Sequence, residues 1–244
     1  MPTPLLIALQ LLTRLPVRTQ YPSARQTGYS LLYYPLIGFF IGAVLCLISA
    51  LLPTQSTLLL AALILLVWTL ITGGLHLDGL ADSADAWIGG FGDREKTLRI
   101  MKDPACGPIA VAVLVLILLI KFSALQVALE QSVLAAVLIS PIMARAAVIA
   151  LYLTTPYAKD EGMGLLLIEN LPKKTAVVVL VMTAGLCLLG SGALALMMLT
   201  TATVTFWLLR KLMCTRIGGV TGDTTGALIE ITETTTLVAA ALLM

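Results

Sequence analysis

The sequence predicts an all-α fold, a polytopic integral membrane bundle of about six to seven spans that forms a single domain over residues 1–244. Of the 244 residues, 59% are hydrophobic, 11% are charged, and the mean hydropathy is +1.02. A water-soluble core does not need that much apolar surface. The apolar residues form long runs between short polar segments, and the basic residues gather in only some of those segments, as in proteins that cross a membrane repeatedly.

The first apolar run, residues 3–13, is long enough for a helix but too short to cross about 30 Å of hydrocarbon. We therefore expect an interfacial or packed helix that ends at Arg14-Leu15-Pro16. The expected spans follow in order at about 31–52, 57–72, 108–129, 132–154, 175–189 and 193–210, and a last apolar run covers Leu237–Met244.

Lysine and arginine indicate how the spans are oriented. The turns at 53–56, 130–131 and 190–192 contain neither residue. The basic segments, which alternate with these turns, are the amino terminus, 89–107, 155–174 and 210–217. The positive-inside rule places the basic segments in the cytoplasm.

Three aspartates after the second expected span, Asp78, Asp82 and Asp85, follow the spacing i, i+4, i+7. On a helix this spacing keeps the carboxylates within roughly 60° of one face. Like charges held together repel unless a cation lies between them, and Mg²⁺ takes oxygen ligands and usually brings substrate phosphates. A solvated acidic helix is the alternative. Because acids are scarce in this chain, we favour a site for a metal and a diphosphate.

A second acidic segment, at 218–233, carries Asp223, Glu230 and Glu233, which share a face within roughly 80° if 223–233 is helical. The glycines before Asp223, Gly222 among them, allow close approach to a phosphate, and the start of a helix offers free N–H groups. The alternative is that Asp223 or Thr224 only caps the helix and that the glutamates are solvated.

Both acidic segments lie on the expected cytoplasmic side, so we expect them to form one site. The expected metal ligands are Asp78, Asp82, Asp85 and Asp223.

Several cations are further candidates. Arg145 lies deep in the fourth span, where a charge usually faces the bundle interior; we expect it to contact a substrate phosphate, with pairing to an acid as the alternative. Lys121, in the third span, is expected to extend its charge to the outer surface. Arg94, Arg99 and Lys102 could neutralise a diphosphate, although a purely topogenic role is equally plausible for each.

Other side chains are expected to be structural. We assign a structural role to His76, the only histidine, and interfacial anchoring to Trp87 and Tyr157. Asp103 fits either a ligand or a helix start before Pro104. The four cysteines have neither CxxC pairs nor ligand spacing, so neither a disulfide nor a zinc site is expected.

At these residues the chain resembles the cobalamin synthase family, the adenosylcobinamide-GDP ribazoletransferases of bacterial and archaeal membranes. Small departures occur at Ala86-Trp87, where a glycine is usual, and at Pro104-Ala105-Cys106, which replaces a more polar stretch. The likeness runs nearly end to end, through Leu12-Thr13-Arg14-Leu15-Pro16, Asp78-Gly79-Leu80-Ala81-Asp82-Ser83-Ala84-Asp85, Ile100-Met101-Lys102-Asp103, Ser140-Pro141 with Arg145, Pro156-Tyr157-Ala158-Lys159, Glu161-Gly162, and Thr221-Gly222-Asp223 with Glu230 and Glu233.

The resemblance implies a Mg²⁺-dependent phosphotransferase. Such an enzyme transfers the cobinamide-phosphate moiety of adenosylcobinamide-GDP to α-ribazole or its 5′-phosphate and releases GMP, late in cobalamin biosynthesis. It implies a multi-pass protein of the bacterial inner membrane with its active site facing the cytoplasm. The expected partners are these small molecules and the lipid bilayer, with no nucleic acid; a homo-oligomer is left open.

Metal-assisted attack on a diphosphate can also be argued from the residues, while the substrates themselves are what the resemblance implies. Attack by a sugar hydroxyl on a diphosphate needs the charge of the leaving phosphate neutralised and the nucleophile held in line. Mg²⁺ on Asp78, Asp82 and Asp85 would bridge the diphosphate. Asp85 or Asp223 would take the hydroxyl proton. Arg145, the loop cations, Gly222, Glu230 and Glu233 complete the expected site.

Two alternatives use similar residues. A CDP-alcohol phosphotransferase that makes phospholipids also has aspartates on membrane helices, but Asp82 stands where its motif needs an arginine, and no GxxxDxxxD follows. A cation transporter would carry its carboxylates within the spans, whereas these acidic segments lie at the ends of spans.

Overall fold

The computed structural model describes residues 3–19, 22–52 and 56–243, and this part of the chain is helical without any strand. Its one β-type contact is an isolated bridge between Tyr157 and Val220. The predicted all-α class is confirmed. The helices are α1 (Thr3–Leu12), α2 (Ala24–Ser30), the 3₁₀ turn η1 (Leu31–Tyr33), α3 (Tyr34–Leu51), α4 (Thr57–Thr72), α5 (Leu75–Gly89), α6 (Arg94–Ile100), α7 (Pro108–Glu130), α8 (Leu134–Thr154), α9 (Met163–Glu169), α10 (Lys173–Ile217) and α11 (Gly222–Leu242).

Four described segments are long and apolar enough to cross a membrane: Ala24–Leu51, α7, α8 and α10. The bent pair α4 and α5 makes a fifth if the pair is counted as one span. The expected number of six to seven spans is larger than these four or five segments. It counted the two arms of α10 separately and added the last apolar run. The two arms are real, since Gly192 interrupts α10 with φ 50° and ψ −122°.

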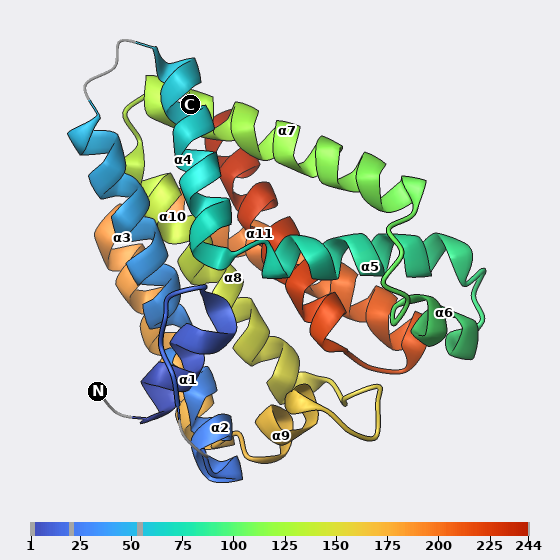
Figure 1. The fold of residues 1–244 in the computed structure, drawn as a ribbon. Coiled ribbons are helices and arrows are strands. Elements are labelled where there is room, and N and C mark those ends of the chain that lie inside the picture. The colour runs from blue at the N-terminus through green and yellow to red at the C-terminus, as the bar shows by residue number, and fades with distance from the viewer. Residues whose placement is uncertain (1–2, 20–21, 53–55, 244) are drawn as a thin grey trace.

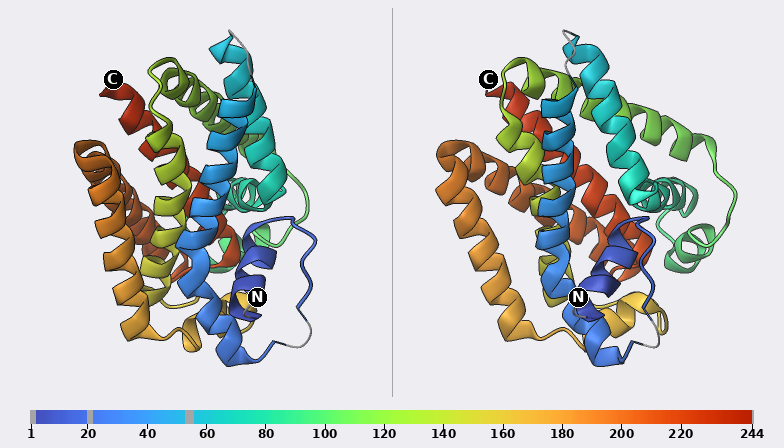
Figure 2. Two further views of the ribbon diagram at one scale, coloured as in Figure 1. Left: turned by 90° about the vertical axis from the view of Figure 1, so that its left-hand side faces the viewer. Right: turned by 60° about the vertical axis from the view of Figure 1, so that its left-hand side comes forward.

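The helices form a bundle around α8 and α11. Figures 1 and 2 show α3, α4, α8 and the first arm of α10 side by side, with α11 running obliquely through the centre. α11 packs against α5, α7, α8 and α10. α3 packs closely on α8 at Gly38, where an added Cβ would lie 2.4 Å from the carbonyl oxygen of Pro141.

The two ends of the bundle differ. The α7–α8 turn and the carboxyl-terminal helix end lie at one end, and α1, α2 and α9 lie at the other (Figure 1). The hydroxyl of Thr57 donates to the Glu130 carboxylate at 3.0 Å, which places the start of α4 beside the α7–α8 turn. Of the first expected lysine-free turn, Pro53, Thr54 and Gln55 lie outside the described residues; Met244, at the end of the last apolar run, does too.

The short first helix does not cross the bundle. α1 packs against α2 and α3, as expected for a packed helix. It ends where the Thr13 hydroxyl donates to the carbonyl of Leu9 at 2.7 Å, and the backbone N–H of Arg14 donates to the carbonyl of Ile71 at 2.8 Å. The segment after α1 is therefore attached to the end of α4.

Candidate active site

A glycine corner sets the direction of the first acidic helix. Gly73 and Gly74 have φ of 63° and 69°, which glycine adopts without the strain that a Cβ would bring. The Arg14 side chain covers this corner, since a Cβ on Gly73 would lie 1.9 Å from its Cγ. α5 consequently leaves the direction of α4 by 87° and lies across the bundle. We treat α4 as the membrane-crossing arm and α5 as outside the spans.

The two acidic segments meet where α5 crosses α11. A Cβ on Gly79 would lie 2.6 Å from the carbonyl oxygen of Asp223, and a Cβ on Gly226 would lie 3.2 Å from Cα of His76. Only glycine allows backbones to approach this closely. The expectation that both segments belong to one place in the fold is confirmed for the amino-terminal part of α11.

A cavity of about 330 Å³ opens beside this crossing, a volume within the range of small-molecule sites. Asp78 and Asp223 both line it, and so do Gly222 and His76. The remaining lining residues come from α1, α3, α5, α8, α9, α11 and the loop after α8. They are Leu11, Leu12, Tyr34, Leu75, Gly79, Tyr152, Tyr157, Met163, Gly164, Leu167, Thr225, Gly226 and Ile229, and Tyr34 is the first residue of α3.

Asp82, one turn beyond Asp78, is only partly exposed. Burial first, and then the charges of Asp78, Asp223 and Asp85, raise its pKa to about 6, against a smaller opposing effect of Lys159. The four carboxylates are therefore close enough to repel one another, and this part of the protein has more negative than positive charge. Such a place stabilises a bound cation.

Asp223 is free of the helix cap. The α11 cap is Thr221, whose hydroxyl accepts from the N–H of Thr224 at 3.2 Å while the Thr224 hydroxyl accepts from the N–H of Thr221. The alternative that Asp223 or Thr224 is the capping residue is wrong. The Asp223 carboxylate instead accepts from the Thr221 hydroxyl at 3.3 Å and lies 3.5 Å from the ammonium of Lys159. Lys159 had no expected role in the sequence, where it appeared only as the last residue of the Pro156-Tyr157-Ala158-Lys159 motif.

Asp85 does not share the open position of Asp78. One of its carboxylate oxygens accepts from the N–H of Gly107 at 2.6 Å, and the other accepts from the N–H of Ala110 at 2.9 Å. These groups belong to the start of α7, where an anion satisfies free N–H groups. The structure therefore gives Asp85 a structural contact, and its expected role as a metal ligand or base stays a prediction.

Glu230 and Glu233 do not reach the cavity either. Both are buried and pair with Lys121, at 3.0 Å in the case of Glu230, and Glu233 also pairs with Arg145. Lys121 lies on α7 and Arg145 on α8, so four charges from three helices compensate one another inside the bundle. The expectation that Lys121 extends its charge to the outer surface is therefore wrong. Arg145 pairs with an acid, which was the alternative to contact with a substrate phosphate.

The loop cations divide into two kinds. Arg94 donates through Nε to the carbonyl of Ile217 at 2.9 Å and through Nη2 to the carbonyl of Ala158 at 2.8 Å. It thus holds two chain segments together instead of pointing at the cavity. Arg99 and Lys102 lie exposed on or just after α6.

Asp103, Trp87 and Tyr157 also have defined places. Asp103 accepts from the N–H of Ala105 at 3.0 Å, a turn contact before α7. Trp87 is partly buried against the core. Tyr157, expected at the membrane surface, lines the cavity instead.

The described residues include no group of three or more histidine, cysteine or acidic side chains arranged to hold a metal by themselves. Mg²⁺ usually binds proteins through one or two carboxylates and completes its shell with water and substrate phosphates. Asp78, Asp82 and Asp223 are the carboxylates that fit such a partial shell, because they crowd together without an equal number of cations.

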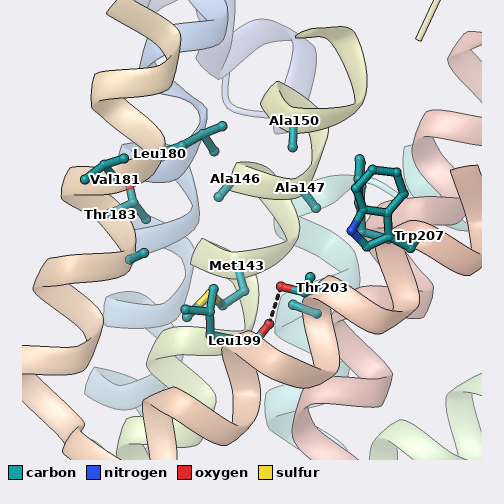
Figure 3. Close-up of a pocket in the computed structure, with 13 residues that line it drawn as sticks. Met143, Ala146, Ala147, Ala150, Leu180, Val181, Thr183, Leu199, Thr203 and Trp207 are labelled. Atoms are coloured by element: carbon teal, nitrogen blue, oxygen red, sulfur yellow. Dashed lines mark hydrogen bonds between the residues drawn. The ribbon is translucent and has the colours of Figure 1, made fainter. Parts of the chain in front are cut away.

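A second cavity, of about 350 Å³, lies between α8 and the two arms of α10 (Figure 3). Met143, Leu199 and Trp207 represent its apolar lining. Its threonines are Thr183 and Thr203, and the hydroxyl of Thr203 donates to the carbonyl of Leu199 at 2.7 Å (Figure 3). None of the described residues that line it is charged, so it offers no groups for phosphate chemistry.

Comparisons with known proteins point to one family. A family model described as cobalamin-5-phosphate synthase matches residues 4–241. The chain is 55% identical to the adenosylcobinamide-GDP ribazoletransferase of Stutzerimonas stutzeri (strain A1501) over 240 residues, 98% of each chain. It is 52% identical to the protein of that name from Pseudomonas fluorescens (strain Pf0-1), over 98% of this chain and 99% of the relative. No solved structure matches.

Proposed function

The chain belongs to the cobalamin-5-phosphate synthase family, and on that premise we propose that it transfers the cobinamide-phosphate moiety of adenosylcobinamide-GDP to α-ribazole or α-ribazole 5′-phosphate. The products are adenosylcobalamin, or its 5′-phosphate, and GMP. The observation that carries the proposal is the meeting of Asp78 and Asp223, from segments far apart in the sequence, at one cavity.

The reaction exchanges one phosphorus–oxygen bond for another. A ribose hydroxyl of the acceptor attacks the phosphorus that bears cobinamide, the bond from that phosphorus to the GMP oxygen breaks, and the hydroxyl proton goes to a carboxylate. Asp223 suits this proton transfer because it lines the cavity and is oriented by Thr221 and Lys159.

Positive groups at the same place would bind the diphosphate. Lys159, 3.5 Å from Asp223, can reach a non-bridging oxygen. The α11 amino terminus begins at Gly222, which lines the cavity and has no neighbour within 4 Å of an added Cβ. Backbone N–H groups at such a terminus bind phosphate well.

Asp78 and Asp82 would hold Mg²⁺. The ion would neutralise the diphosphate and the departing GMP. Burial first and the charge of Asp78 second raise the pKa of Asp82 to about 6. The fit to a cation rests on the second of these causes, the repulsion between carboxylates. A cation between these carboxylates removes that repulsion.

We assign the cavity to the cytoplasmic side of the bacterial inner membrane. The support is the excess of Lys and Arg in the segments at that end. In a background without Cys46, Cys106, Cys187 and Cys214, Gln131→Cys should react with a membrane-impermeant thiol reagent in intact cells, whereas Lys96→Cys should not. Labelling of Lys96→Cys alone would reverse the orientation.

The function is tested with detergent-purified protein, adenosylcobinamide-GDP and α-ribazole, with and without Mg²⁺. We expect equal amounts of cobalamin and GMP, and loss of both when the metal is chelated. Absence of GMP and cobalamin with folded protein and either acceptor would overturn the proposal, while turnover that is unaffected by chelation would remove only Mg²⁺.

A further inference from the structure

The cavity has two chemically different walls. Asp78, Asp223 and Gly222 form one wall, which the proposed function assigns to the phosphate chemistry. The other wall is apolar and aromatic. It combines Leu11 and Leu12 of α1, Tyr34 of α3, Tyr152 of α8, Tyr157, and Met163 and Leu167 of α9.

The apolar wall is built of close contacts. A Cβ on Gly164 would lie 2.3 Å from the Tyr157 ring, so the ring packs directly on α9. The Tyr152 hydroxyl is occupied, at 3.2 Å from the Thr225 hydroxyl. Leu12 and Leu167 are buried, and Met163 is half exposed. A flat apolar group would therefore meet rings and aliphatic side chains here.

The volume limits what can enter. About 330 Å³ is at the lower end of the range for small-molecule sites, about 300–1,000 Å³. This space suits one nucleoside. It is too small for the whole of adenosylcobinamide-GDP, which carries a corrin ring and two further nucleosides. Only one substrate, or one part of a substrate, can occupy the cavity.

The chemistry of the wall selects between the candidate nucleosides. Guanine presents hydrogen-bonding groups along its edges, and burying them against apolar side chains without partners is unfavourable. The benzimidazole base of α-ribazole is flat and mostly apolar at its edge. The apolar wall matches the second base.

His76 adds a polar group at the boundary of the two walls. Its side chain lines the cavity and is 5% exposed, and its buried Nδ1 has no hydrogen-bond partner. Buried imidazole nitrogens are normally paired. The ring thus has unused hydrogen-bonding capacity beside the place where the acceptor's sugar would lie.

We propose that this cavity is the acceptor subsite: the base of α-ribazole lies against the wall formed by Leu12, Tyr157, Met163 and Leu167, and its ribose points toward Asp78 and Asp223. The assignment rests on the proposed function. It makes this wall the determinant of which base is accepted. The corrin ring stays outside the cavity, with its diphosphate at the mouth.

Met163→Trp tests the assignment, with Leu166→Trp as the matched control. Both residues are exposed positions on α9, 52% and 41%, but only Met163 lines the cavity. Titration calorimetry with α-ribazole alone should show that Met163→Trp raises the Kd for α-ribazole about tenfold or more. Steric changes in an apolar pocket discriminate between ligands by about 10–200-fold. The KM for adenosylcobinamide-GDP should stay within about twofold, and Leu166→Trp should match the wild type in both.

The same series with unsubstituted benzimidazole riboside sharpens the result. The smaller base should lose less affinity than α-ribazole on Met163→Trp, because it fills less of the cavity. Equal binding of α-ribazole by both variants and the wild type, with turnover intact, would overturn the subsite and leave the function standing. A raised KM for adenosylcobinamide-GDP in Met163→Trp alone would assign the cavity to the other substrate. Wild-type protein that binds α-ribazole but releases no GMP would overturn the function while the binding site remains.

Discussion

Two groups of acids on and around α11 have opposite surroundings. Asp223, in the first turn, lines an open cavity with Asp78, whereas Glu230 and Glu233, two and three turns further along the same helix, are buried against Lys121 and Arg145. The difference lies in charge compensation. The buried glutamates are matched by as many cations. Near the cavity, Lys159 pairs with Asp223 and its charge also acts on Asp82, so one cation faces more than one carboxylate.

Compensation separates structural from chemical roles. A buried, paired charge is fixed by its partner and cannot bind a ligand without losing that partner. Carboxylates that repel one another are satisfied only when a cation arrives, and that is what binding a metal-bridged diphosphate supplies. The proposed function therefore assigns the phosphate chemistry to Asp78, Asp82 and Asp223, whose charges are not compensated.

The largest expected effect is a loss of stability when the buried ion pairs of Glu233 are broken. Glu233→Gln removes the acid that pairs with both Lys121 and Arg145 and leaves two buried cations with one glutamate. Breaking a buried pair in this way costs about 3–5 kcal/mol of the free energy of unfolding. Thermal denaturation in detergent should show a large loss of stability. Wild-type stability, with activity lost instead, would mean that Glu233 belongs to the reaction and not to the scaffold.

The next effect is a loss of transfer rate when one of the crowded aspartates near the cavity is neutralised. Asp82→Asn keeps the size of the side chain and removes one charge from the expected metal shell. The rate should fall at least ~100-fold, since one charge-stabilising element is commonly worth ~2.7–4 kcal/mol in the transition state. Stability should not fall, because the substitution relieves repulsion. Near-normal turnover with unchanged Mg²⁺ dependence would remove Asp82 from the site.

Asp85→Asn is the matched control, three residues away on the same helix. It weakens the two contacts to the start of α7. Loss of such a helix-terminal acceptor costs ~0.5–2 kcal/mol, so stability should drop modestly while the rate stays within about tenfold of wild type, because no step of the transfer uses this carboxylate. If Asp85→Asn loses as much rate as Asp82→Asn, Asp85 is a ligand after all.

The smallest effect is a pH dependence with opposite signs for stability and rate. Because the folded-state pKa of Asp82 is raised from 3.8 to about 6, the folded protein binds this proton more tightly than the unfolded chain, so the contribution to stability falls as pH rises from about 4 to about 6. The rate should rise over the same interval as the carboxylate ionises. Melting temperatures and initial rates between about pH 4 and pH 7 measure both. In Asp82→Asn this fall in stability with rising pH should disappear. If the fall persists, another group is responsible for it.

The sequence predicted the helical class, the break in α10 at Gly192 and the pairing of Asp78 with Asp223 at one place. These follow from composition, from helix-breaking glycines and from the distribution of Lys and Arg. The sequence could not predict the ion pairs among Lys121, Arg145, Glu230 and Glu233. Helical spacing tells which face of a helix carries a side chain, but not which helix packs against that face. Two cations and two acids in otherwise apolar segments were the available signal.

Asp85 shows the same limit. Its i+7 spacing from Asp78 gave it the same expected role, but the N–H groups it accepts from belong to residues 22 and 25 positions further along the chain. The corner at Gly73-Gly74 and the close crossing at Gly79 and Gly226 likewise depend on tertiary contacts. Glycine permits such geometry without requiring it.

A double-mutant cycle on the transfer rate shows whether Asp78 and Asp223 act in one site. Asp78→Asn and Asp223→Asn should each lower kcat/KM strongly. The double variant should lose much less than the sum of the two free energies, because groups that act as a unit are not additive. Additive losses, within about 0.5 kcal/mol, would contradict the account and show that the two acidic segments work independently.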